Sequence, residues 1–121
     1  MADKRAVALF KLQADICKTM ADPNRLMILH ELRDGEMSVG QIVKRLDLPQ
    51  SNVSRHLAVL RERDIVQARR AGTTIYYSLS SLKISQACDL VRDMLETQLG
   101  AKKELARSLN SLGGRGKRAG K

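Results

Sequence analysis

The sequence predicts a mainly α-helical fold with one small β-hairpin, in the element order ααααββα. Apolar residues recur at helical spacing over most of the 121-residue chain. Only between residues 65 and 79 does this spacing give way to short runs rich in β-branched and aromatic residues. With two Tyr, one Phe and no Trp, the core must be aliphatic, which suits helices packed on helices. A chain of this length is expected to form one domain.

The first two predicted helices are delimited by their apolar stripes and their end signals. The first spans residues 6–20, and its apolar stripe consists of Leu9, Leu12, Ile16 and Met20, with Phe10, Ala14 and Cys17 beside them. For the second, Asp22 is a candidate N-cap, Pro23 suits the first helical position and Gly35 suits the residue just past the end. The buried side of this second helix is expected to consist of Leu26, Ile28, Leu29 and Leu32.

Residues 38–60 predict two short helices joined by a tight turn. Ser38, with Gln41 three residues later, forms a capping box for the third helix. The turn is Asp47-Leu48-Pro49, and Pro49 is expected to be the first residue of the fourth helix. The apolar stripe of that helix consists of Val53, Leu57 and Leu60.

The front of the fourth helix carries small hydroxyls, amides and one arginine. The residues concerned are Gln50, Ser51, Asn52, Ser54, Arg55 and His56. Such side chains fit into a major groove and exchange hydrogen bonds with base edges, whereas a solvated face is normally rich in Lys and Glu. We therefore expect these residues to face DNA. For His56, nearer the apolar side, a packed position with a bond to phosphate or backbone is the alternative.

A basic hairpin and a further helix follow. Residues 65–70 and 74–79 flank Ala71-Gly72-Thr73. Four side chains at the tip are expected to contact phosphates, which position a protein without specifying sequence: Arg69, Arg70, Thr73 and Thr74. The last helix is expected to begin at Ser80 or Ser81 and to reach Leu99. The domain is predicted to span residues 1–110, followed by a disordered basic tail over 111–121.

Charge and composition narrow the class of protein. The chain has 22 basic and 13 acidic residues, a net charge of +9, which indicates a polyanionic partner. Its apolar runs are far shorter than the ~20 residues that span a bilayer. Two cysteines and no signal peptide predict a reducing cytoplasm. No nucleophile–base pair or phosphate-binding glycine loop is visible, so an enzyme is not expected.

The predicted elements follow one another in the order of a winged helix-turn-helix. The segments ADPNRLMILHEL (21–32), GEMSV (35–39), SNVSRHLAVLRERDIV (51–66) and IYYSL (75–79) closely resemble the ArsR/SmtB family of repressors. The resemblance implies a homodimer formed through the first and last helices, bound to an inverted-repeat operator in double-stranded DNA and released by an inducer. Pro49 departs from the Ser N-cap of many relatives.

The resemblance does not extend to the family's metal sites. Ser38 and Gly40 stand where many relatives have cysteines. The last helix has acidic residues but no histidine to bind zinc, so no metal or other cofactor is expected. Sulfide-responsive relatives use two cysteine positions that here hold His30 and about Glu96.

Cys17 and Cys88 are the remaining candidates for sensing an inducer. They lie on the apolar stripes of the first and last helices. Three interpretations stay open: two unrelated core residues, a disulfide or persulfide switch, or a site for a thiophilic metalloid such as arsenite with a third ligand.

Two alternatives to an inducer-released repressor also remain. One is a DNA-binding regulator without thiol or metal sensing. The other is a protein that binds nucleic acid without specificity, which would more often expose aromatic residues for base stacking. Tyr76 and Tyr77, inside a strand, are a poor platform for that purpose.

Overall fold

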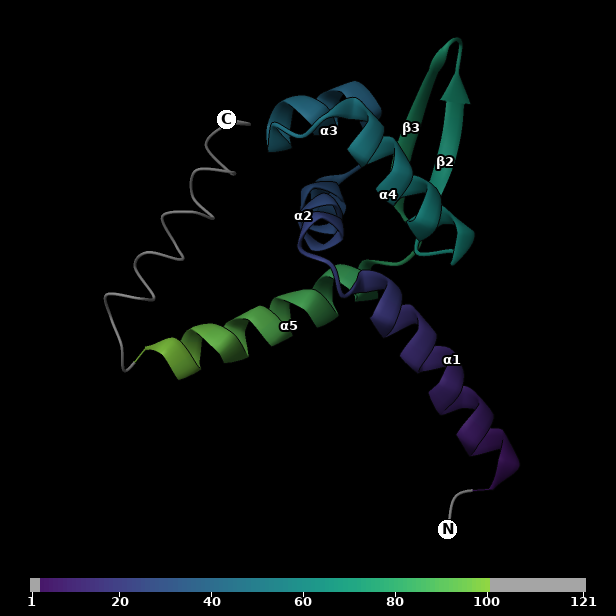
Figure 1. Ribbon diagram of the computed structural model, residues 1–121, viewed down its shortest axis with the longest axis vertical. Coiled ribbons are helices and arrows are strands. Elements are labelled where there is room, and N and C mark those ends of the chain that lie inside the picture. Colours follow the sequence, from purple (N-terminus) through teal and green to yellow (C-terminus); the bar gives the residue numbers. More distant parts are fainter. Residues whose placement is uncertain (1–2, 101–121) are drawn as a thin grey trace.

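The computed structural model describes residues 3–100 and confirms the predicted order of helices and hairpin (Figure 1). Its elements are α1 (Lys4–Met20), α2 (Pro23–Glu31), the short 3₁₀ helix η1 (Leu32–Asp34), β1 (Met37–Ser38), α3 (Val39–Leu46), α4 (Gln50–Glu62), β2 (Val66–Ala71), β3 (Thr74–Leu79) and α5 (Leu82–Leu99). The end of the predicted domain (residues 101–110) and the predicted basic tail (111–121) fall outside the described residues. Within residues 3–100, no helix is long and apolar enough to cross a membrane.

The sheet has one strand more than the sequence predicted. The strand order is β1-β3-β2, and both pairings are antiparallel. In the hairpin Ala71 lies opposite Thr74, so the turn consists of Gly72 and Thr73. Gly72 has a φ of 64°, a conformation that glycine adopts without steric strain. The two-residue strand β1 pairs with β3, with Met37 opposite Tyr77. Because β1 directly precedes α3, this pairing joins the hairpin to the start of α3.

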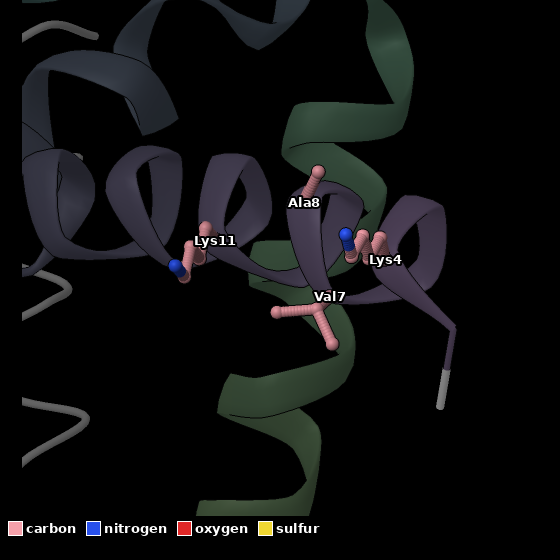
Figure 2. A pocket seen from close by; sticks show the side chains of 4 residues that line it. All are labelled: Lys4, Val7, Ala8 and Lys11. Carbon is pink, nitrogen blue, oxygen red and sulfur yellow. The ribbon is translucent and has the colours of Figure 1, made fainter. Parts of the chain in front are cut away.

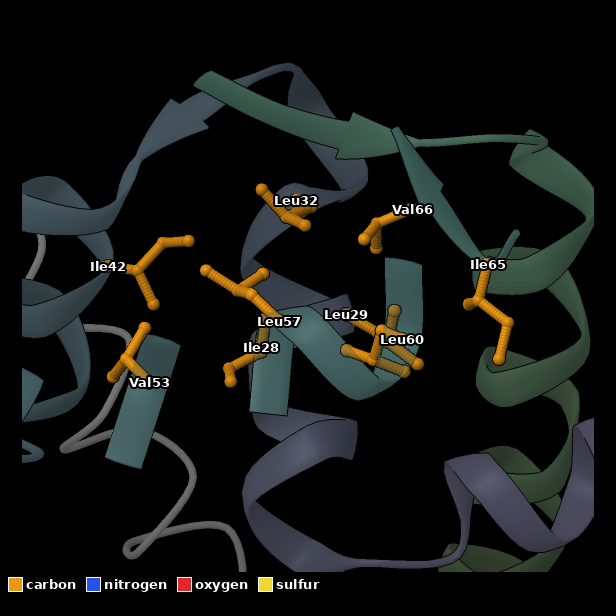
Figure 3. Packing of buried hydrophobic residues seen from close by; sticks show 9 residues of the cluster. All are labelled: Ile28, Leu29, Leu32, Ile42, Val53, Leu57, Leu60, Ile65 and Val66. Carbon is orange, nitrogen blue, oxygen red and sulfur yellow. The ribbon is translucent and has the colours of Figure 1, made fainter. Parts of the chain in front are cut away.

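The core lies between α2, α3, α4 and the base of the hairpin (Figure 3). Its fully buried side chains are Ile28, Leu29, Leu32, Ile42, Val53, Leu57, Leu60, Ile65 and Val66. All are aliphatic, as the composition predicts. Burial of each stabilises the fold by about 1.5–3 kcal/mol, and three of these side chains, Val53, Leu57 and Leu60, belong to one side of α4.

Side chains at the helix starts satisfy the backbone N–H groups that have no partner within the helix. Asp22 Oδ2 accepts from Arg25 N at 3.1 Å, and the Ser38–Gln41 capping box is complete. Pro49 corrects the prediction slightly: it is the N-cap of α4 rather than its first residue, and its backbone is extended (φ −58°, ψ 143°). Ser81 caps α5, one of the two starts expected.

Helices α1 and α5 project from this core in different directions (Figure 1). Only Thr19 is buried in α1, and no residue of α5 is buried. Large apolar side chains on both helices are exposed in the single chain: Val7, Leu9, Phe10, Leu12, Ile16, Leu82, Leu90, Val91, Met94 and Leu95. The prediction for Leu26 was wrong: it is exposed on α2, because the core contacts of that helix run through Ile28 and Leu29.

Candidate nucleic-acid interface

Helix α4 is divided into a buried and an exposed face. Val53, Leu57 and Leu60 are fully buried, whereas Ser51, Ser54 and Arg55 are exposed. Gln50 is also exposed and Asn52 is half-buried. Four of the six residues predicted to form the polar front are therefore exposed, on a helix whose other side packs into the core.

Arg55 is oriented by its neighbour on the helix. Its Nη2 donates to Asn52 Oδ1 at 2.8 Å, an i, i+3 contact. A guanidinium held at one edge loses less conformational freedom when its remaining donors bind an acceptor. The pair thus presents a partly ordered group of donors at the front of α4.

The turn between α3 and α4 fixes how α4 is presented. Asp47 ends α3 in the left-handed region (φ 55°), where short polar residues are tolerated, and Leu48 packs against the core. Arg45 Nη2 of α3 lies 2.9 Å from Glu31 Oε1 of α2, and the Glu31 side chain is only 4% exposed. This ion pair joins α3 to α2.

His56 is packed rather than exposed, but its partner is a side chain and not the phosphate or backbone group expected for the packed alternative. It is only 4% exposed, and its Nδ1 accepts a hydrogen bond from Arg25 Nε of α2 at 3.2 Å. Burial is the main cause that lowers the pKa of His56 below its ordinary value, with Arg55 and Arg25 acting in the same direction and Asp22 opposing them. Of the six polar residues assigned to the front of α4, this one lies inside the protein.

The two arginines of the hairpin differ in their surroundings. Arg69 donates to Glu36 through Nε at 3.0 Å and through Nη2 at 2.7 Å, and its guanidinium lies 5.0 Å from the centre of the Tyr76 ring. This pairing lowers the pKa of Glu36 and raises the pKa of Arg69. Arg70 and Thr73 are exposed, and Thr74 is half-exposed at the start of β3. Arg69, expected to contact phosphate, thus already has a carboxylate partner.

The cysteines are both free thiols. Cys17 is exposed on α1 and Cys88 is half-buried on α5, where burial is the main cause that raises its pKa. Residues 3–100 contain no cluster of three or more His, Cys, Asp or Glu side chains able to hold a metal ion. The hollow lined by Lys4, Val7, Ala8 and Lys11 lies along α1 alone, and its lining side chains are exposed (Figure 2). It offers no enclosed binding site.

Two residues that bind the predicted site residues were not identified from the sequence. Glu36 lies 33 residues before Arg69, and Arg25 lies 31 residues before His56. No local spacing rule connects residues so far apart. The one available signal was Glu36 immediately before the segment that becomes β1, which would have mattered only if the pairing of β1 with β3 had been predicted.

Comparison with known proteins agrees with this geometry. Residues 22–68 match the model of the bacterial regulatory protein, arsR family. The chain is 42% identical over 76 residues to the transcriptional activator HlyU of Vibrio cholerae, covering 63% of this chain and 70% of HlyU. It also resembles the crystal structure of the transcriptional repressor BigR from Xylella fastidiosa (TM-score 0.68, 32% identity, 78% of this chain and 96% of that one).

A third relative is known as a dimer. The homodimeric winged helix-turn-helix DNA-binding domain of a Mycobacterium bovis protein matches with a TM-score of 0.72 and 30% identity, over 81% of this chain and 91% of that one. These relatives regulate transcription and bind DNA rather than catalyse reactions, in line with the expectation that the chain is not an enzyme.

Proposed function

Because this chain belongs to the arsR family of bacterial regulatory proteins and is a DNA-binding transcriptional regulator, we propose that it represses transcription by binding an inverted-repeat operator as a homodimer. The observation that carries the proposal is the exposed polar face of α4, formed by Ser51, Ser54 and Arg55 on a helix packed into the core. In the proposed complex this face lies in the major groove and reads base edges.

The β2–β3 hairpin, here called the wing, and the start of α4 would supply contacts to phosphate. Arg70 and Thr73 are exposed near the hairpin tip. Pro49 makes no side-chain hydrogen bond to the first turn of α4, which also lacks acidic residues. The N-terminus of a helix favours phosphate. These contacts would position the protein on the duplex, and α4 would select the sequence.

The dimer would be formed by α1 and α5. Their apolar side chains are largely exposed in the single chain, for example Leu9 at 65% and Val91 at 62%. An exposed apolar area of this extent on a small charged protein marks an interface with another protein. A second copy is the expected partner, since two-fold pairing presents two reading helices to the two halves of an inverted repeat.

Selection from a random duplex library tests the proposal. The full chain should enrich a duplex with two similar half-sites in inverted orientation, here called the enriched duplex. It should prefer this duplex over bulk DNA by at least about 10³-fold at physiological salt. Arg55→Ala should lose about 1–3 kcal/mol of discrimination at a few base pairs while keeping its affinity for bulk DNA. Enrichment of no sequence would instead favour a protein that coats nucleic acid without specificity.

We further propose that Cys17 and Cys88 act as the inducer sensor. The support is their placement on the two helices assigned to the dimer interface, one exposed and one half-buried. Burial raises the pKa of Cys88, which lowers its thiolate fraction. Because Cys17 is exposed and Cys88 is half-buried, chemistry with an oxidant or a thiophilic ligand would begin at Cys17.

A further inference from the structure

A partly buried contact joins α4, the helix proposed to read DNA, to α2 and α1. His56 of α4 accepts from Arg25 Nε of α2 at 3.2 Å. The same guanidinium donates through Nη1 to the carbonyl oxygen of Thr19, in the last turn of α1, at 2.8 Å. Arg25 also lies in the first turn of α2, where its backbone N–H donates to the N-cap Asp22. One arginine therefore connects the end of α1, the start of α2 and the middle of α4.

A second contact joins α1 to the C-terminal end of α4. Arg63, at the C-terminal end of α4, lies 3.9 Å from Asp15 of α1 (Nη1 to Oδ2). This ion pair is about half exposed and contributes little by itself. Helix α4 is therefore linked to α1 directly through Arg63 and indirectly through Arg25, and the link through Arg25 is the less exposed of the two.

The contact at His56 requires the neutral imidazole. Arg25 is always a donor, so Nδ1 must carry a lone pair and the ring proton must be on Nε2. Nε2 lies 4.0 Å from Asp22 Oδ2. A second proton on Nδ1 would place two N–H donors against each other and add a buried charge beside a guanidinium. Of the charged groups acting on this ring, only Asp22 favours that proton, whereas Arg25 and Arg55 oppose it.

We propose that His56 is a positioning residue for α4, that it acts through Arg25, and that it does so only as the neutral imidazole, so that operator binding weakens on acidification. This inference rests on the proposed function. Net charge alone predicts the opposite pH dependence of DNA affinity. Added protons make a chain of net charge +9 more positive, which strengthens its attraction to phosphate.

The pKa of His56 determines the pH range in which its contact with Arg25 is lost. Burial lowers the pKa of His56 in the folded chain below its ordinary value of 6.5. The stabilisation by the neutral contact is therefore complete above about pH 6.5 and is lost as the pH falls through the lower folded-state pKa. Below that pKa only the neutral fraction is competent, so each further pH unit should weaken binding by up to about tenfold.

The experiment compares affinity for the enriched duplex between pH 7.5 and 5.5 at constant ionic strength. Binding by the wild-type chain should be weaker at pH 5.5 than at pH 7.5, and weaker still at any lower pH at which the chain stays folded. His56→Gln, which can still accept from Arg25 but does not titrate, should bind well at both values. His56→Leu, which leaves the Arg25 donor without its acceptor, should bind weakly at both. His30→Gln removes the other histidine of the chain and should behave like wild type.

Circular dichroism at both pH values separates unfolding from displacement of α4, and His56→Gln remains decisive if His56→Leu does not fold. Tighter wild-type binding at pH 5.5, or equal pH sensitivity of His56→Gln and wild type, would overturn the proposal. If no duplex is enriched, the proposed function fails and the DNA part of this inference with it. Nitrogen NMR of the DNA-free chain then tests the contact itself, and a proton on His56 Nδ1 at neutral pH would refute it.

Discussion

Arg69 and Arg70 are neighbours in β2, but their electrostatic surroundings are opposite. Arg69 is held by both oxygens of Glu36 and lies over Tyr76, whereas Arg70 is exposed near the tip of the hairpin. A phosphate near Arg69 must compete with a carboxylate that is already in place. At the scale of single residues, we therefore expect the wing to use Arg70 as its phosphate contact and Arg69 to fix the hairpin against the segment before β1.

Two substitutions should move DNA affinity in opposite directions. Arg70→Ala should weaken binding to all duplexes alike and lower the slope of log affinity against log salt by about 1. Glu36→Gln should strengthen binding to all duplexes and steepen that slope by up to about 1, because it releases Arg69. Salt titrations with the enriched duplex and with bulk DNA measure both. A Glu36→Gln chain with the wild-type slope would show that Arg69 does not reach phosphate even when released.

At the scale of elements, the capping box of α3 should contribute measurably to stability. Ser38 Oγ accepts from Gln41 N at 3.2 Å, and Gln41 Oε1 accepts from Ser38 N at 2.9 Å. Ser38→Ala should lower the free energy of unfolding by about 1 kcal/mol, measured by urea denaturation. Ser85→Ala is a matched control, since the Ser85 hydroxyl donates to the carbonyl of Leu82 within α5 and caps no helix. Its effect should stay within about 0.5 kcal/mol; equal losses in both variants would contradict the assigned role of the box.

The same helix ends explain how much of the fold the sequence could predict. Asp22, Ser38 and Ser81 act on N–H groups two or three residues away, so their roles can be recognised from local spacing. The strand β1 has two residues and exists only because β3 lies beside it, some 40 positions later. A pattern that short carries no periodicity of its own.

The candidate site was predictable to the same extent. Helical spacing correctly separated Ser51, Ser54 and Arg55 from the buried stripe of α4. It left His56 undecided, because its burial depends on Arg25 from another helix. Leu26 likewise belongs to the apolar side of α2 by spacing, yet the core occupies a narrower part of that side. Tertiary partners decide such borderline positions.

At the scale of the whole molecule, the proposed cysteine sensor would act through the helices that join the copies. If Cys17 and Cys88 together sense the inducer, Cys17→Ser and Cys88→Ser should each abolish release of the enriched duplex by peroxide, persulfide or arsenite. The fluorescence anisotropy of labelled duplex measures this release. The reduced forms of both variants should bind DNA like wild type. Undiminished release from both serine variants would show that the thiols have no part in sensing.

The dimer interface itself can be tested on α5. Val91 lies near the middle of the exposed apolar stripe of that helix and is 62% exposed in the single chain, so Val91→Lys should leave the fold of each copy intact. If two copies meet through α1 and α5, however, the lysine would be buried there without a partner and should split the dimer.

Gln86→Lys adds the same charge on the polar side of α5 and should leave the dimer unchanged. Sedimentation at micromolar concentration distinguishes the two states. Because one copy carries only one reading helix, the Val91→Lys monomer should lose most of its preference for two half-sites over one, and a dimeric Val91→Lys chain would place the interface elsewhere.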